Sequence, residues 1–240
     1  MPYDRGAHLT AALSKAKSMP PSVVCCGMSR SGSTWLYNVV QAFRPDMTGL
    51  YCETEKALPT SLNGVLIKCH GPDDAMIARV RAENIPVIVT VRDPRDVVVS
   101  FMDCFNESLS AAMDTLPLCA GPIVKLADYA ALALRYEDDF PHDIRSVEAV
   151  AKIVGSTSAV NPDDVLANLH RDSVRAEVER LERDVFDPAL GPAQHDPISH
   201  WHPRHIGDAA IGKHASRLTQ QQQDEVLERT RAYCDLFGYS

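Results

Sequence analysis

A short buried strand, a loop of small polar residues and an amphipathic helix follow one another across residues 22–43. The apolar run 22–26 is typical of a strand, and apolar residues recur at helical spacing from Trp35 to Phe43. Gly27 and Gly32 match the two glycines of the phosphate-binding loop G-x-x-x-x-G-K-[ST]. Such a loop favours an anion, because unpaired N–H groups and the helix dipole meet at the helix N-terminus.

The loop departs from that pattern at one decisive position. Residue 33 is serine, whereas the lysine expected there contacts the β- and γ-phosphates of ATP or GTP. The loop therefore lacks the main cation that a P-loop kinase or another NTP-dependent transferase would need. Such an enzyme is the alternative interpretation. Arg30 supplies a cation from within the loop instead.

Strands and helices alternate through the first half of the chain, which predicts an α/β fold with a parallel sheet covered by helices on both faces. Further strands are expected at 64–70 and 86–91, each followed by a helix, at 73–84 and 97–105. The remaining expected helices are 7–19, 123–134, 143–154, 162–169, 173–183 and 219–237, with an irregular loop at 187–205. We interpret residues 1–240 as a single domain.

Composition excludes several classes of protein. The net charge of −8 argues against a nucleic-acid binder, which needs a broad basic surface. The chain has neither an apolar signal sequence nor about 20 consecutive apolar residues for a membrane span. Its seven cysteines are odd in number and lack C-x-x-C spacing, as expected of free thiols. We therefore expect a cytoplasmic protein with neither membrane nor nucleic acid as partner, and its oligomeric state stays open.

Four segments, in order, resemble the PAPS-dependent sulfotransferase family, where PAPS is 3′-phosphoadenosine 5′-phosphosulfate. Residues 29–35 are similar to its 5′-phosphosulfate loop, P-K-S-G-T-T-W. Residues 68–72 resemble its K-T-H-x-P segment, and 91–101 are similar to its 3′-phosphate motif, R-N-P-K-D-V-x-V-S. Residues 135–138 resemble its Y-E-D motif. The resemblance implies a three-layer P-loop-like domain.

The resemblance also implies the reaction. Such an enzyme transfers a sulfuryl group from PAPS to a hydroxyl or amine of a small-molecule acceptor, leaves PAP as product, and requires no metal. His70 takes the role of general base, while Lys68 and Arg30 stabilise the transferring group. The residue types agree, since a neutral imidazole accepts a proton near neutral pH and residues two apart on a strand share one face.

For the nucleotide, the resemblance implies two anion sites and a base site. Arg92 and Ser100 would hold the 3′-phosphate, Trp35 would lie under the base, and Tyr136 would hydrogen-bond the nucleotide. Core packing remains the alternative for the two aromatic residues, and a surface ion pair with Asp93 or Asp96 remains the alternative for Arg92. The 5′ end would be held by Arg30, Ser31, Gly32, Ser33 and Thr34.

The C-terminal part of the resemblance is weaker. Residues 211–214 resemble a V-G-D-W motif, and 172–174 faintly resemble the adenine-side T-S-F. The Arg-Lys-Gly triplet that closes over the 3′-phosphate in the family is replaced here by residues 207–209, Gly-Asp-Ala. Arg204 and Lys213 are therefore the candidates for that role.

Acceptor specificity is expected from the loops at 50–63, 106–122 and 187–205. Four histidines in the last of these lack the helical H-E-x-x-H frame, so we interpret them as a solvated or acceptor-facing loop, in preference to a metal site. A catalytically silent nucleotide-binding protein is the remaining alternative. The presence of both Lys68 and His70 argues against it.

Overall fold

The computed structural model describes residues 22–187, 194–203 and 206–240, so the helix predicted at 7–19 and the candidate Arg204 lie outside the described residues. Five parallel strands form one sheet in the order β2-β3-β1-β4-β5. The strands are β1 (Val23–Gly27), β2 (Thr48–Tyr51), β3 (Val65–Cys69), β4 (Val87–Val91) and β5 (Leu132–Arg135).

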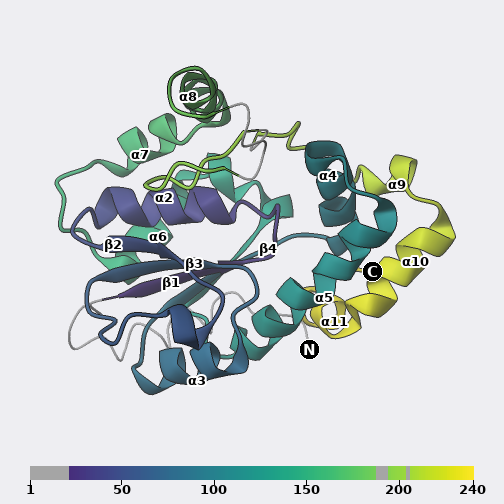
Figure 1. Ribbon diagram of the computed structural model, residues 1–240, viewed down its shortest axis with the longest axis horizontal. Helices are drawn as coiled ribbons and strands as arrows, with labels where there is room; N and C mark the ends of the chain where they lie inside the picture. Colours follow the sequence, from purple (N-terminus) through teal and green to yellow (C-terminus); the bar gives the residue numbers. More distant parts are fainter. Residues whose placement is uncertain (1–21, 188–193, 204–205) are drawn as a thin grey trace.

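The alternation of side chains along β1 divides the apolar interior into two layers. Val23 and Cys25 belong to the cluster on one face of the sheet, while Val24 and Cys26 belong to the cluster on the other. All four side chains are buried, as expected of a central strand covered on both sides. The predicted α/β fold with a parallel sheet between two helical layers is confirmed (Figure 1).

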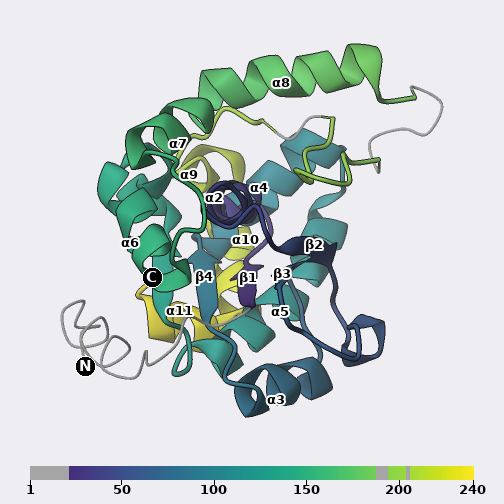
Figure 2. The same ribbon diagram turned by 90° about the vertical axis from the view of Figure 1, so that its left-hand side faces the viewer.

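Helices from distant parts of the chain build the two layers (Figure 2). One face carries α2 (Ser33–Phe43), α6 (Ile144–Val154) and α7 (Pro162–Asn168). The other face carries α3 (Asp74–Ala82), α4 (Pro94–Phe105), α5 (Leu109–Leu126), α10 (Gln220–Arg229) and α11 (Arg231–Phe237).

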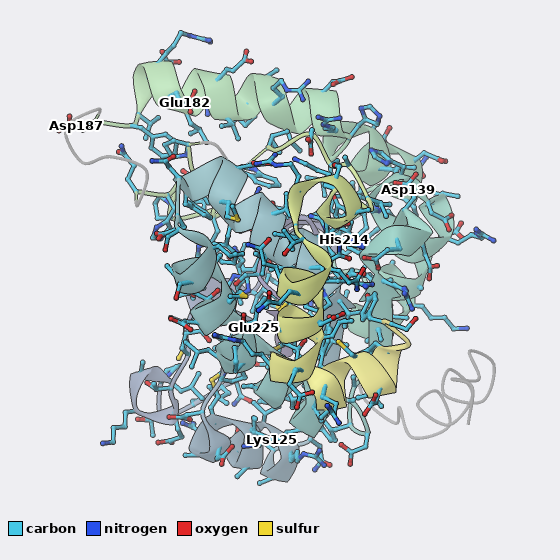
Figure 3. All side chains as sticks on the ribbon, turned by 90° about the vertical axis from the view of Figure 1, so that its right-hand side faces the viewer. Lys125, Asp139, Glu182, Asp187, His214 and Glu225 are labelled. Carbon is cyan, nitrogen blue, oxygen red and sulfur yellow. The ribbon has the colours of Figure 1, made fainter. Side chains whose placement is uncertain are left out.

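Two further helices lie outside these layers. The long helix α8 (Arg171–Asp184) runs beyond α7, and its apolar face forms a separate cluster with Trp201. The short helix α9 (His214–Arg217) leads into the C-terminal pair, and Figure 3 views the molecule from that side. Three 3₁₀ turns complete the described elements, at Glu55–Ala57, Tyr136–Asp138 and Phe140–His142.

The segment 106–122, expected as an acceptor loop, is instead mostly helix α5. Ser108 caps this helix by accepting from the Ala111 N–H at 3.2 Å, and its apolar face enters the core. Two prolines, Pro117 and Pro122, lie inside the helix. Each costs about 3 kcal/mol in a helix interior, so burial of the apolar face outweighs local propensity here.

Three other boundaries differ from expectation. The predicted helix 123–134 is the end of α5 followed by strand β5, because pairing with β4 overrides the helical spacing. Strand β2 lies partly within a segment interpreted as a loop, and the predicted helix 219–237 is divided at Thr230 into α10 and α11. Within the described part of the chain, no helix has the length and apolar character to cross a membrane.

Candidate active site

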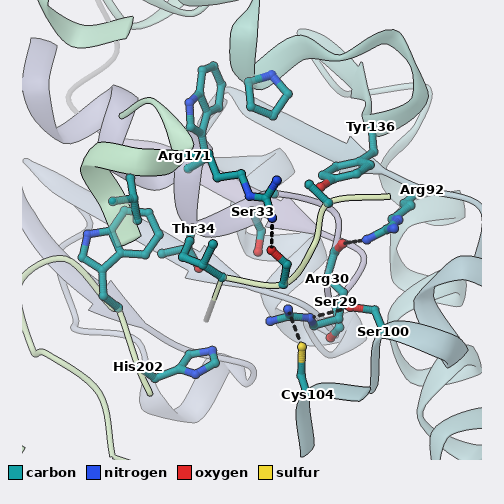
Figure 4. Close-up of a pocket in the computed structure, with 18 of the residues that line it drawn as sticks. Ser29, Arg30, Ser33, Thr34, Arg92, Ser100, Cys104, Tyr136, Arg171 and His202 are labelled. Atoms are coloured by element: carbon teal, nitrogen blue, oxygen red, sulfur yellow. Dashed lines mark hydrogen bonds between the residues drawn. The ribbon is translucent and has the colours of Figure 1, made fainter. Parts of the chain in front are cut away.

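The carboxyl ends of all five strands border one cavity of about 710 Å³ (Figure 4). Ligand sites of open α/β sheets lie at this edge. Every predicted site residue except Ser31 and the undescribed Arg204 lines the cavity. These residues are Arg30, Gly32, Ser33, Thr34, Trp35, Lys68, His70, Arg92, Ser100, Tyr136 and Lys213.

Two glycines shape the loop between β1 and α2 for different reasons. A Cβ on Gly27 would lie 2.2 Å from Thr90 Oγ1, so only glycine allows the loop to approach β4 this closely. Gly32 has a φ of 84°, and a Cβ there would lie 2.8 Å from the ring of Phe140. Because α2 begins directly after Gly32, its first N–H groups meet the cavity.

Ser31 holds the loop together and does not line the cavity. Its N–H donates to Met28 O at 3.1 Å, and its hydroxyl bonds to Thr90 Oγ1 at 2.7 Å and to Met28 O. Both polar groups are thus engaged within the fold, and the side chain is fully buried. The structure therefore places Ser31 within the hydrogen bonding of the loop and outside the lining of the cavity.

Lys68 and His70 meet at the end of β3. The Lys68 ammonium donates to Thr34 Oγ1 at 2.6 Å, and burial lowers the pKa of this lysine to about 8. His70 Nδ1 lies 2.7 Å from Gly27 O, and since a carbonyl only accepts, Nδ1 carries the proton. The neutral ring then leaves the lone pair of Nε2 available. Burial, followed by repulsion from Lys68, lowers the pKa of His70 to about 4.

Glu53 fixes the turn that presents His70. Its carboxylate accepts from the N–H of His70 at 2.9 Å and from the N–H of Gly71 at 2.6 Å. A carboxylate holding two backbone N–H groups is a strong anchor. Nothing in the local pattern around Glu53 indicates this contact, because it depends on the parallel pairing of β2 with β3.

Arg30 connects the phosphate loop to helix α4. Its Nε donates to Ser100 Oγ at 3.0 Å and its Nη2 to Cys104 Sγ at 2.9 Å (Figure 4). Arg30 itself has a φ of 63°, a left-handed conformation that is uncommon outside glycine. The two predicted anion sites, one at Arg30 and one at Ser100, are therefore neighbours joined by a direct hydrogen bond.

Arg92 is held from several sides at the end of β4. Its guanidinium donates to Arg30 O at 3.0 Å and to Ala210 O at 2.8 Å, and its Cζ lies 4.2 Å from the centre of the Tyr136 ring. Its Nε is buried without a hydrogen-bond partner. Its Nη2 lies 4.0 Å from Asp96 Oδ2, and because both side chains are buried, this ion pair is not the surface pair weighed as the alternative.

Tyr233, from α11, fixes the backbone of Arg92. Its hydroxyl accepts from the Arg92 N–H and donates to the Arg92 carbonyl, both at 3.0 Å. The tyrosine is fully buried, so removing its hydroxyl would leave two buried groups unpaired at a cost of about 1–3 kcal/mol each. Tyr233 lies 141 residues from Arg92 in the sequence, so local sequence patterns do not reveal this contact.

The C-terminal segment closes one side of the cavity without an unpaired lysine. Lys213 lines the cavity, but its ammonium pairs with Asp103 and, at 2.7 Å, with Asp208. Asp96 is buried and accepts from the N–H of Gly212 at 2.6 Å and from that of His214 at 3.0 Å. Asp96 therefore positions this segment through two backbone contacts.

Residues 194–203 supply another part of the cavity wall. Asn38 on α2 holds them by donating to Ser199 O at 2.8 Å. His195, His200 and His202 line the cavity, and burial lowers the pKa of His200 and of His202 to about 4. No group of three ligands suited to a metal ion occurs among the residues with described positions.

Trp35 serves both the core and the cavity. Its ring packs edge-on against Phe140 at 5.2 Å between centres, and its Nε1 is buried without a partner. The same residue lines the cavity. Trp35 thus packs in the core, as the alternative interpretation expected, and part of its indole also borders the cavity.

The chain shares its fold with solved structures of a sulfotransferase and of a retinol dehydratase. Mouse sulfotransferase SULT7A1, solved with PAP, has a TM-score of 0.62 and 14% identity, with 98% of this chain and 94% of that chain covered. A retinol dehydratase, solved with retinol and PAP, has a TM-score of 0.57 and 12% identity, with 95% and 86% covered. At such identities the likeness concerns the fold alone. No curated protein matches the sequence.

The sequence itself carries the family assignment. The model of the sulfotransferase domain matches residues 20–140, which is 121 of the 240 residues. This range contains the phosphate loop, the pair Lys68 and His70, and the end of β4 with Arg92. The chain belongs to the sulfotransferase family, and it is a sulfotransferase enzyme.

Proposed function

We propose that this enzyme transfers the sulfuryl group of PAPS to a hydroxyl of a small-molecule acceptor, with His70 as general base. The observation that carries the proposal is the state of His70. The Gly27 carbonyl fixes the proton on Nδ1, and the lowered pKa keeps the ring neutral at physiological pH. The lone pair of Nε2 can then accept the acceptor's proton.

The sulfuryl group is transferred in a single in-line displacement. The acceptor oxygen forms a bond to sulfur while the bond between sulfur and the bridging phosphate oxygen breaks. The acceptor's proton passes to His70 Nε2, and PAP leaves with the electron pair of the broken bond. The chain's own contribution is to position the two reactants and to stabilise the charge on the leaving oxygen.

Two cations and a helix end supply that stabilisation. Lys68 is held at Thr34, the second residue of α2, and Arg30 belongs to the loop that precedes the helix. The buried Nε of Arg92 has no partner within the described protein, as expected of a group that binds an anionic ligand. These features fit a donor with two separate anionic ends.

The same contact of Lys68 disfavours the kinase alternative. In a phosphate loop of the G-x-x-x-x-G-K-[ST] type, the final serine or threonine holds Mg²⁺. Thr34 occupies that position here, and its Oγ1 accepts from the Lys68 ammonium at 2.6 Å. An ammonium group beside Thr34 repels a divalent cation, so the arrangement favours transfer without a metal.

The charges of the cavity favour an acceptor hydroxyl over a cationic amine. The carboxylates among the described lining residues are Asp103, Asp139 and Asp208. Asp103 and Asp208 pair with Lys213, and Asp139 pairs with His142 at 2.7 Å. Two of the three lining carboxylates among the described residues are thus neutralised by Lys213, which leaves little negative charge in the cavity to bind an ammonium group.

The test is to incubate the enzyme with PAPS and a panel of small phenols, aliphatic alcohols and amines, and to measure PAP release by chromatography. We expect acceptor-dependent PAP release that EDTA does not reduce, with hydroxyl compounds as the better acceptors. The matched variant His70→Gln should bind PAP yet release almost none. Turnover of ATP with Mg²⁺, in place of PAPS, would contradict the proposal.

A further inference from the structure

Arg171 reaches the cavity from an element that sequence comparison does not place there. It is the first residue of α8, and its side chain lines the cavity beside residues from the sheet (Figure 4). Its Nη2 donates to Gly207 O at 2.8 Å. Arg171 directly precedes the segment 172–174, whose faint likeness to the adenine-side motif is the one sequence signal near it.

The charge of Arg171 is not neutralised by a described carboxylate. The nearest acidic residue in sequence, Asp172, pairs with Arg175 at 3.2 Å. No ion pair of Arg171 occurs among the described residues, and its Nε is buried without a hydrogen-bond partner. A partly buried guanidinium of this kind is costly unless an anion completes its surroundings.

Arg171 and Arg92 hold the same segment of the C-terminal region. Arg171 donates to the carbonyl of Gly207, and Arg92 donates to the carbonyl of Ala210. Both guanidinium groups extend toward the region around Tyr136 in Figure 4. Burial raises the pKa of Tyr136, while Arg92, Arg30 and Arg171 act in the opposite direction, as expected of cations gathered near one phenol.

The segment between these two carbonyls has no cation of its own. Residues 207–210 are Gly-Asp-Ala-Ala, and the ammonium of Lys213 is engaged by two carboxylates. We propose that Arg171, together with Arg92, binds the 3′-phosphate of the donor nucleotide and so replaces the basic residues that this segment lacks. This inference rests on the proposed use of PAPS.

The ligand itself can serve as one arm of the test. PAP and 5′-AMP differ only in the 3′-phosphate, so a residue that binds this phosphate should affect PAP alone. We would measure the affinities of the wild type, Arg171→Gln and Arg171→Lys for both nucleotides by calorimetry. Arg175→Gln is the matched control, because it removes a half-buried arginine of the same helix that pairs with Asp172 and does not line the cavity.

Arg171→Gln should weaken PAP binding by about 10- to 100-fold, as expected for a charge-assisted hydrogen bond, and leave 5′-AMP binding within about twofold. Arg171→Lys keeps the charge and should lose less. An equal loss for PAP and 5′-AMP, or equal losses in the two Arg171 variants, would overturn the role.

Failure of the inference is distinct from failure of the proposed function. If the wild type prefers PAP to 5′-AMP and Arg171→Gln keeps that preference, only the role of Arg171 is refuted. If the wild type binds neither PAP nor PAPS, the proposed donor is refuted as well. Thermal unfolding of each variant shows whether any loss of binding comes from a loss of folded protein.

Discussion

The site has two regions that are built in different ways. The sheet-end region consists of the loop 28–32 with the first residues of α2, and of Lys68, His70 and Arg92, all at the ends of strands whose register is fixed by parallel pairing. The C-terminal region consists of α8 and residues 206–214, and side chains of other elements hold it to the sheet. Groups that carry chemistry lie in the first region, while the second closes over the nucleotide in our proposal.

This difference predicts two kinds of failure. A variant of His70, which faces the acceptor, should lose turnover and keep donor binding. The strands and turns that hold the donor do not depend on its side chain. Variants among the arginines that contact residues 206–214 should lose donor binding first. The predictions below follow that division, from the largest effect to the smallest.

The largest effect is expected from His70→Gln. Loss of the general base should reduce kcat by about 100- to 10,000-fold, the usual contribution of general acid–base catalysis. PAP affinity, measured by calorimetry, should stay within about twofold. The control His202→Gln removes a second histidine that lines the cavity and should leave kcat within about tenfold. Unchanged turnover in His70→Gln would remove the catalytic role from the sheet-end region.

The next effect concerns Arg92, where the two regions meet. Arg92→Met removes the donors to Arg30 O and Ala210 O and should weaken PAP binding by about 10- to 100-fold. Arg95→Met is the matched control, because Arg95 pairs with Asp93 outside the cavity. Equal PAP affinity in the two variants would show that Arg92 has only a structural role.

The dependence of kcat/KM on pH should be a smaller effect than those of the two variants above. The pKa of His70 is lowered to about 4, so the base form persists down to about that pH and activity is lost as the pH falls through it. The pKa of Lys68 is lowered to about 8, so its positive charge is lost as the pH rises above that value. In kcat/KM, which reports the free enzyme, we expect a plateau between these limits.

A single variant tests the alkaline limb. Lys68→Arg carries a charge that persists throughout the accessible pH range, so the decline above about pH 8 should disappear in that variant if it folds. An acid limb near 6.5, the value of a solvated histidine, would contradict the buried state of His70.

Sequence patterns predicted the sheet-end region because its constraints are local. Each of its features lies within one strand and the turn that follows it. These features are the spacing of Gly27 and Gly32, the two-residue step from Lys68 to His70, and the place of Arg92 after an apolar run. The parallel sheet with helices on both faces followed from the alternation of strands and helices. Ser31 shows the limit, because its inward position is set by Thr90 of a neighbouring strand.

Helix α8 was expected at 173–183 and is present, but the contacts that join the C-terminal region to the sheet escaped prediction because they are tertiary. Arg171 comes near Gly207 across 36 residues, and Tyr233 supports Arg92 across 141. Strand β5 and helix α5 were misplaced for the same reason, since pairing with β4 and burial of one face outweighed the local pattern. No single segment of the sequence contains these relationships.

The central claim is that the cavity accepts a 3′-phosphorylated adenine nucleotide, and thermal unfolding with PAP, PAPS, ATP or GTP tests it most directly. At 100 times its Kd, a ligand stabilises the folded state by about 2.7 kcal/mol, which for a chain of this length raises Tm by about 5–10 °C. We predict such a rise with PAP and PAPS and a much smaller one with ATP or GTP, with or without Mg²⁺. No rise with PAP, or a larger rise with ATP and Mg²⁺, would contradict the account.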